Sequence, residues 1–499
     1  MTPPRPETCI EKRGTHAVTR EAAISHRWCR PGSIPALPFG GFWESGFGRI
    51  HSAGNNRTVM AVPTRRTSVP HFCRRPASTC SSRRLQCRCP REAGQEMSEL
   101  SRRRVLTLGA ALGLVGVGDV VAPTWSWAAT GSVAGTGTGT DPQWVWDDTI
   151  DRVMASVIDN GQVPAVNAAI LPWTNNNAPL PTGLPADLAS YLQQATKLPS
   201  WADMSLLRRA ADFNRRKDTY LFMLYGLGSG IMSTVIPREA RAVYWSEGSA
   251  DMKSRAAKTF TFGYDLSQSN AFEPNGQFVV TANKTRMVHA AVRHLLPQSP
   301  QWKAAATENV PISNGDILVT FHSLGTFVHS KLQQWKVPMS KADENAFLHM
   351  WQVAISLLGV KDEYIPKTWA DTHAQSAQVL SPILMPTTEG RNLAEVLLGL
   401  VSEVDLGVTR GFLNEFARYV LGDAVADSLG LPRDLVSAGI IKVGWPTYIL
   451  FREGLLPIMP VNFYLFDQFI RAVAMAFLNG GTSTQTTPIT IPDINRPAA

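Results

Sequence analysis

The sequence predicts an all-helical fold. Beyond residue 143, apolar residues recur at the three-to-four spacing of amphipathic helices, whereas few segments alternate as strands do. Neither an internal repeat nor the βαβ alternation of a parallel sheet is visible. The helical patterns cover approximately 144–157, 204–216, 251–262, 285–297, 341–359, 368–384, 391–405, 408–429, 433–441 and 460–478.

The first 128 residues predict an export signal preceded by an extension. Residues 1–96 are rich in Arg, Pro and Ser and lack sustained periodicity; we interpret them as a disordered, non-native upstream extension. Residues 97–128 resemble a twin-arginine signal peptide, with Ser101-Arg102-Arg103-Arg104 before the apolar run Leu108–Val121. Small residues at Ser126 and Ala128 predict cleavage before Ala129. The interpretation predicts secretion by the twin-arginine export machinery and no membrane span in the mature protein.

Charge and cysteine content argue against nucleic-acid binding and against thiolate chemistry in the chain after residue 96. Residues 1–96 hold 16 basic and 6 acidic residues, so 32 basic and 34 acidic residues remain after them, a net charge of −2. The basic pI therefore gives no support to nucleic-acid binding. All six cysteines also lie before Met97, which excludes thiolate chemistry later. We expect a flexible Gly/Thr-rich linker at 129–143, one domain at 144–488 and a loosely ordered tail at 489–499.

Local patterns define three further features along the domain. Three prolines in 178–185 predict a loop. Gly226, Gly228 and Gly230 follow a helical pattern, and Ile231 stands where a dinucleotide loop needs glycine, so the glycines predict close helix packing. In the 251–262 helix, Arg255, Lys258 and Thr259 share one face, which by itself is typical of a solvated surface.

A single histidine interrupts the apolar stripe of the 285–297 helix. Met287, Ala291 and Leu295 recur at helical spacing, and Pro297 ends the pattern. His289 in such a stripe is either a core histidine with satisfied nitrogens or a ligand of a metal or haem iron. The helix alone leaves both interpretations open.

A competing motif is Asp316 to Gly325, which resembles the strand and nucleophile elbow of an α/β-hydrolase around Ser323. Phe321 stands two residues before this serine, where the sharp turn requires glycine, and the flanking patterns are helical. A secreted serine hydrolase using Ser323 is therefore the distant alternative.

Two motifs in a fixed order resemble the latex-clearing proteins, secreted b-type haem dioxygenases that cleave rubber. The first is Arg255-Ala256-Ala257-Lys258-Thr259, and the second is Thr285-Arg286-x-x-His289-Ala290-x-Val292-Arg293. The likeness extends from about Trp144 to Pro488 and includes Asp362-Glu363-Tyr364-Ile365-Pro366 and His322-Ser323-Leu324. It implies a globin-like helical core with additional helices, binding one haem b.

The resemblance also implies roles for individual residues. His289 matches the proximal haem ligand, and Lys258 the lysine that occupies the distal iron position in a closed state. Arg255 and Thr259 match neighbours near the haem, and Glu239 matches a glutamate proposed as catalytic base. Two further arginines are candidates for contacts with haem propionates or with structural carboxylates: Arg286 and Arg293.

The expected substrate is poly(cis-1,4-isoprene), cleaved with molecular oxygen to aldehyde and ketone ends. A hydrocarbon polymer offers no charge, so an apolar channel must recognise it, while an iron porphyrin supplies the reactivity toward oxygen. We expect a monomer. A haem oxygenase acting on another hydrophobic substrate is the near alternative; a non-catalytic haem carrier leaves Glu239 without a task.

Overall fold

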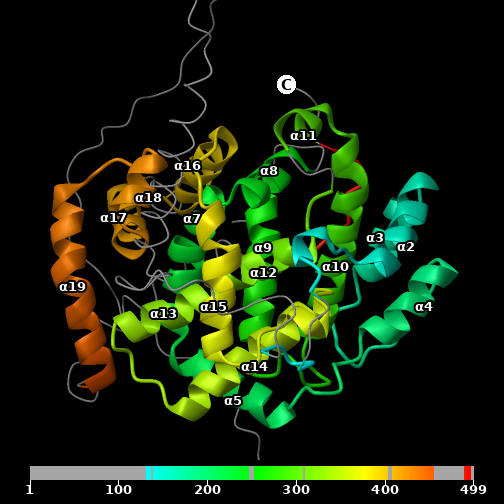
Figure 1. Cartoon of the computed structure of the whole chain (residues 1–499), viewed down its shortest axis with the longest axis horizontal. Helices are drawn as coiled ribbons and strands as arrows, with labels where there is room; N and C mark the ends of the chain where they lie inside the picture. Colours follow the sequence, from blue (N-terminus) through cyan, green and yellow to red (C-terminus); the bar gives the residue numbers. More distant parts are fainter. Residues whose placement is uncertain are drawn as a thin grey trace, which may run out of the picture. The chain divides into compact units, whose positions relative to one another are not determined.

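The computed structural model describes residues 131–135, 139–246, 252–306, 310–402, 407–454 and 488–495, all within the compact unit Cys87–Ala499. Regular structure in these ranges is helical (Figure 1), and the extended pairings among them are two isolated bridges, Ser132 with Pro366 and Ser246 with Asn495. The all-helical prediction is confirmed. The predicted extension 1–96 and signal peptide 97–128 lie outside the described residues.

The first described elements are η1 (Pro142–Trp144), α2 (Asp148–Asp159), α3 (Val163–Ile170) and α4 (Ala186–Ala195). The turn η1 contacts α12, and the three helices share an apolar cluster with α10. In α2, Ile150, Met154 and Val157 are buried at the four- and three-residue spacing expected for one helix face. They join an apolar cluster with Met287 and Ala290 of α10, so the predicted stripe of 144–157 faces the core. The predicted loop at 178–185 is confirmed.

The next segment contains α5 (Met204–Arg216), α6 (Asp218–Met223), the π-helical turn η2 (Leu224–Ser229), α7 (Gly230–Met232), η3 (Ser233–Val235) and α8 (Pro237–Trp245). Asp203 caps α5 by accepting hydrogen bonds from the backbone of Ser205 and Leu206. In η2, a Cβ at Gly228 would lie 2.7 Å from Phe327, which confirms close packing at this glycine, whereas a Cβ at Gly226 would lie at an ordinary 3.8 Å from Phe260.

Helices α9 (Met252–Ser267) and α10 (Phe278–Leu295) form a neighbouring pair. The Thr281 hydroxyl and the Gln277 amide both donate to Asp265, and the rings of Phe262 and Phe278 lie 5.1 Å apart. The pair therefore has a fixed register over the first turns of α10. After α10 come η4 (Leu296–Gln298) and α11 (Pro300–Ala305).

The chain continues through α12 (Asn314–Phe321), the π-helical turn η5 (His322–Thr326), α13 (Phe327–Gln334), α14 (Lys341–Leu357), η6 (Asp362–Tyr364), α15 (Trp369–Val379) and η7 (Ser381–Ile383). Capping boxes start α12 at Ser313 and α14 at Ser340, with Asp316 and Asp343 as the third-residue partners. Helix α14 packs along α5, where the rings of Phe213 and Phe347 lie 5.5 Å apart.

The last described helices differ in part from the prediction. They are α16 (Thr388–Ser402), α17 (Arg410–Leu421), α18 (Asp423–Ser428) and α19 (Leu435–Gly454). The single helix expected at 408–429 breaks at Gly422, whose φ of +89° ends α17. Helix α19 runs past the expected end at 441 and contains Pro446. The predicted helix 460–478 lies outside the described residues.

Two segments expected to be loose are packed instead. In the predicted linker, Val133 N–H donates to Ile365 at 2.8 Å and Gly131 accepts from Lys367 at 2.7 Å. In the predicted tail, Ile491 is 3% exposed. Composition did not indicate these contacts, because it does not show which backbone groups find long-range partners.

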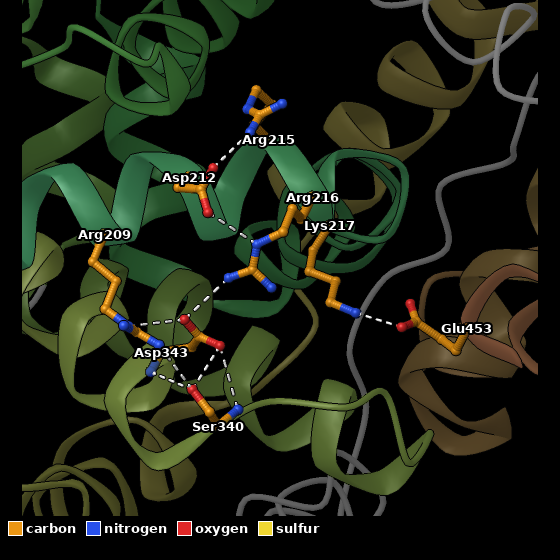
Figure 2. Close-up of polar contacts among 8 residues, drawn as sticks. All are labelled: Arg209, Asp212, Arg215, Arg216, Lys217, Ser340, Asp343 and Glu453. Atoms are coloured by element: carbon orange, nitrogen blue, oxygen red, sulfur yellow. Dashed lines mark hydrogen bonds and ion pairs between the residues drawn. The ribbon is translucent and has the colours of Figure 1, made fainter.

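A charged cluster joins α5, α14 and α19 (Figure 2). Arg209 and Arg216 both donate to Asp343 Oδ1 at 3.0 Å. Lys217, directly after α5, pairs with Glu453 of α19 at 2.5 Å. We refer to these five residues as the α5 charged cluster. Its carboxylates neutralise the basic end of α5 and tie it to two helices far along the chain.

Among the described residues, no single helix has the length and apolarity of a membrane span. Residues Asp218–Val235 and Pro237–Trp245 meet those criteria only as a pair, and the pair bends by 94°. The described part of the chain also contains no group of three or more His, Cys, Asp or Glu side chains arranged to hold a metal ion.

Candidate functional site

His289 lies in the middle of α10, beside buried Met287, Ala290 and Ala291. Its imidazole is half-buried, and Nδ1 is buried without a hydrogen-bond partner among the described residues. Burial, assisted by the positive charge of Arg293, lowers the pKa of His289 to about 3. The imidazole is therefore neutral at physiological pH. This arrangement does not fit the core interpretation, which requires satisfied nitrogens.

The two arginines one turn from His289 form ion pairs with carboxylates. Arg286 Nε donates to Asp147 at 2.5 Å, and its guanidinium lies 5.4 Å from the ring centre of Tyr191. Arg293, 5% exposed, pairs with Asp151 at 2.6 Å. The structure thus places both side chains in the structural carboxylate contacts that the sequence offered as one alternative. These contacts attach α2 to α10.

Helix α9 carries the polar face predicted from the sequence. Arg255 is half-buried, and its guanidinium donates to the Ser246 carbonyl at 2.5 Å and to the Ser246 hydroxyl at 2.8 Å. Lys258 is half-buried one turn further along α9. Thr259 is exposed and donates to the Arg255 carbonyl at 3.2 Å. The face is therefore only partly solvated.

Glu239 lies in the first turn of α8 and is half-buried. The Thr320 hydroxyl of α12 lies 2.6 Å from Glu239 Oε1. Burial raises the pKa of Glu239 to about 8; the Thr320 hydrogen bond opposes this rise, and the negative charge of Asp316 adds to it. A carboxyl with such a pKa can exchange a proton near neutral pH, as a general base must.

Apolar contacts bring α8 close to α10. Ala242 of α8 shares one cluster with Val292 of α10, Leu296 just beyond it, and Trp302 of α11. Arg238 also joins α8 to α12 through a two-point pair with Asp316, at 2.6 and 2.7 Å. The carboxyl lies on α8, the cationic face on α9 and the neutral imidazole on α10 (Figure 1); α9 and α10 are neighbours, and α8 meets α10 through the cluster of Ala242 and Val292.

The structure contradicts the hydrolase alternative. Ser323 is 2% exposed within the π-helical turn η5, and its hydroxyl donates to the Thr320 carbonyl at 2.9 Å. His322 contacts Thr326 at 2.8 Å and Gln375 at 2.9 Å, leaving no pairing with this serine. The strand and sharp turn that a nucleophile elbow requires are absent from this part of the chain.

Sequence reasoning missed two residues beside the site. Thr320 is the partner of Glu239, and Ser246 is the partner of Arg255. Each is a single hydroxyl residue whose partner lies on another helix. No motif or spacing in the sequence distinguishes them from the many other Ser and Thr residues.

Comparisons with known proteins identify the family of the chain. Residues 215–442 match the family described as ER-bound oxygenase mpaB/B'/Rubber oxygenase, catalytic domain. The rubber oxygenase of Streptomyces sp. (strain K30) is 50% identical over 410 residues, covering 81% of this chain and 100% of that protein. The structure of latex clearing protein LCP in the closed state matches with 51% identity and a TM-score of 0.68, over 74% of this chain and 100% of that one. The resemblance to latex-clearing proteins is confirmed, and the chain belongs to the rubber oxygenase family.

Proposed function

We propose that this protein is a secreted, haem-dependent dioxygenase that cleaves poly(cis-1,4-isoprene). The observation that carries the proposal is the match over the full length of a rubber oxygenase, together with a neutral imidazole in α10 whose Nδ1 has no hydrogen-bond partner among the described residues. Both oxygen atoms of O₂ enter the product: each cleaved double bond gives one ketone end and one aldehyde end. The proposal extends beyond family membership in its cofactor, product ends and location.

The residues fit a b-type haem. His289 has the properties of an axial ligand, because its imidazole is neutral and no hydrogen bond from the described residues occupies Nδ1. Lys258, on neighbouring α9, is the proposed distal ligand of a closed state; Arg255 and Thr259 are its neighbours. Arg286 and Arg293 shape the site indirectly, through the carboxylates that fix α2 on α10.

Bound haem supplies the reactivity toward oxygen that amino-acid side chains lack. The protein's task is then to orient an uncharged polymer and to move a proton. Glu239 is the proposed base for an allylic proton, because its pKa of about 8 makes the carboxylate accessible near neutral pH and basic enough to accept a proton. Thr320 positions that carboxylate by donating to Oε1.

The proposal includes partners and location. Export by the twin-arginine machinery would carry a folded, haem-loaded monomer out of the cell to a polymer that cannot enter it. This function needs neither a nucleic-acid partner nor a membrane span in the mature protein. Protein recovered from the culture medium with Ala129 at its N-terminus would support the export route; retention of residues 97–128 there would contradict it.

An absorption spectrum tests the cofactor. Wild-type protein is expected to show a Soret band, and His289→Ala to lose it or shift it strongly, because the axial nitrogen is gone. The matched control is His294→Ala, which removes an imidazole on the same helix that is paired with Asp159 at 2.8 Å; its spectrum should stay unchanged. An undisturbed band in His289→Ala refutes the axial role.

Product analysis tests the substrate. Oxygen uptake with polyisoprene latex should yield oligo-isoprenoids with one aldehyde and one ketone end, and ¹⁸O₂ should label both ends. Haem-loaded protein that consumes oxygen only with another hydrophobic substrate would favour the alternative, a haem oxygenase of the same family with a different specificity.

A further inference from the structure

The C-terminal segment Pro488–Asn495 is fastened to the body of the protein at two points. At the first, the side chain of Asn167 in α3 donates to the Ile491 carbonyl at 2.9 Å and accepts from its N–H at 2.8 Å. Ile491 itself is 3% exposed and belongs to the apolar cluster that contains Met287 and Ala290 of α10. These α10 residues are immediate neighbours of His289 in the helix.

The second attachment is Asn495, which connects two helices. Its side-chain amide donates to the carbonyl of Leu295, the last residue of α10. The carbonyls at the end of a helix can accept bonds from outside it, and the Asn495 amide is such a donor at the end of α10. The backbone of Asn495 forms an antiparallel bridge with Ser246, the residue that ends α8.

Ser246 carries the connection onward to α9. It is 2% exposed, and its hydroxyl donates to Ala242 at 2.6 Å while accepting from Arg255 at 2.8 Å. Its carbonyl accepts a second hydrogen bond from the Arg255 guanidinium. A continuous set of polar contacts thus runs from the end of α10, through Asn495 and Ser246, to Arg255.

We propose that Pro488–Asn495 is a positioning clasp for the haem site, with Asn495 and Ser246 as its positioning residues. The clasp sets where Arg255 lies relative to the helix that carries His289. Neither residue touches the substrate; each acts through Arg255 and the end of α10. The effect of the clasp on catalysis rests on the proposed function. The coupling between the end of α10 and the start of α9 does not depend on bound haem.

The coupling is tested by hydrogen–deuterium exchange in full-length protein. Asn495→Asp keeps the size of the side chain but replaces the amide donor with a carboxylate that repels the Leu295 carbonyl, and Ser246→Ala removes the hydroxyl. Loss of one hydrogen bond of about 1 kcal/mol corresponds to about five-fold faster exchange by local opening, and the carboxylate should raise this factor in Asn495→Asp. We expect this in both variants at residues 290–296 and 252–259, which the clasp connects by way of Asn495 and Ser246.

Two controls separate coupling from general destabilisation. Asn160→Asp removes an equivalent amide contact at a helix end, from Asn160 to the Ser156 carbonyl at 2.8 Å, on α2; it should leave both regions unchanged. Ser246→Thr retains the hydroxyl and should restore wild-type exchange. Equal exchange in Asn495→Asp and wild type at residues 252–259 overturns the proposal.

The haem spectrum gives the second readout. In haem-loaded protein, Asn495→Asp and Ser246→Ala should alter the Soret band and its pH titration, because Arg255 near the distal face is displaced, while Asn160→Asp and Ser246→Thr should not. Absence of a Soret band in the wild type defeats the proposed function, and the exchange data then decide the clasp separately. Faster exchange with an unaltered spectrum overturns the role of the clasp at the haem site.

Discussion

Polar side chains are paired in the α5 charged cluster, whereas polar groups around His289 lack partners or have few. In the cluster, Asp343 accepts from two arginines, and Lys217 pairs with Glu453 (Figure 2). At the site, His289 Nδ1 is buried without a partner among the described residues. The Glu239 carboxyl accepts a hydrogen bond from Thr320, yet burial still raises the pKa of Glu239 to about 8.

The difference separates groups that hold the fold from groups available for chemistry. A buried polar group that has partners lowers the free energy of the folded state, whereas one without partners raises it and survives where function needs it. Helix α10 contains both kinds within two turns. Arg286 and Arg293 are paired like the α5 charged cluster, and His289 between them is not.

The largest expected effect is the loss of turnover in Glu239→Gln. Removal of a general base typically lowers kcat by about 100- to 10,000-fold, while the Soret band should remain. Relative to the wild type, the same variant should become more stable as pH rises above 4.5. The wild-type protein loses stability in this range, because its Glu239 carboxyl ionises near 4.5 in the unfolded state and only near 8 in the folded state. Thermal unfolding at pH 5 and 7.5 measures this gain. Unchanged kcat would remove Glu239 from the role of base.

Asp343→Ala should show the reverse behaviour. It removes the shared acceptor of Arg209 and Arg216 and the capping box of α14, at a cost of about 2 kcal/mol in the free energy of unfolding. Activity per folded molecule should stay at the wild-type level. Denaturant unfolding and kcat should be measured on the same preparation. A loss of kcat with normal stability would show that the α5 charged cluster takes part in catalysis and does not serve only to hold the fold.

A smaller effect is expected on the pH profile. Catalysis by the Glu239 carboxylate requires deprotonation, so kcat/KM should rise with pH through about 8. Thr320→Val removes a hydrogen bond that lowers this pKa, so the rise should move to higher pH, by about half a unit to one unit. Thr320→Ser keeps the hydroxyl and serves as control. A profile that stays in place in the valine variant would exclude Thr320 as a positioning residue.

The smallest effect belongs to Arg215→Ala. Arg215 is 70% exposed and pairs at 2.6 Å with Asp212, which is 50% exposed. An ion pair in water contributes little, so the change in unfolding free energy should lie within about 0.5 kcal/mol. A substantially larger loss of unfolding free energy in chemical denaturation would show that this exposed pair is coupled to the α5 charged cluster through Arg216, which also contacts Asp212.

Periodicity alone predicted α5 and α14 nearly at their observed positions, because each helix is long and shows one sustained pattern. It ended α9 at 262, five residues early, and began α10 at 285, seven residues late. The break at Gly422 was not predicted, since the residues on both sides continue a helical pattern and only the φ of +89° ends the helix. The order of Pro488–Asn495 was also missed, because its fixation depends on Asn167, more than 300 positions away.

By itself, the sequence determined the helical class, the residue types at the site and the motifs that point to the rubber oxygenase family. The tertiary structure decided which polar groups are paired. Asp151 reaches Arg293 across 142 positions, and Thr320 reaches Glu239 across 81. Helix formation depends on neighbours within a few turns, whereas the solvation and partners of a buried group depend on chain segments that meet only in the fold. For this reason, only the structure could separate His289 from the two arginines beside it.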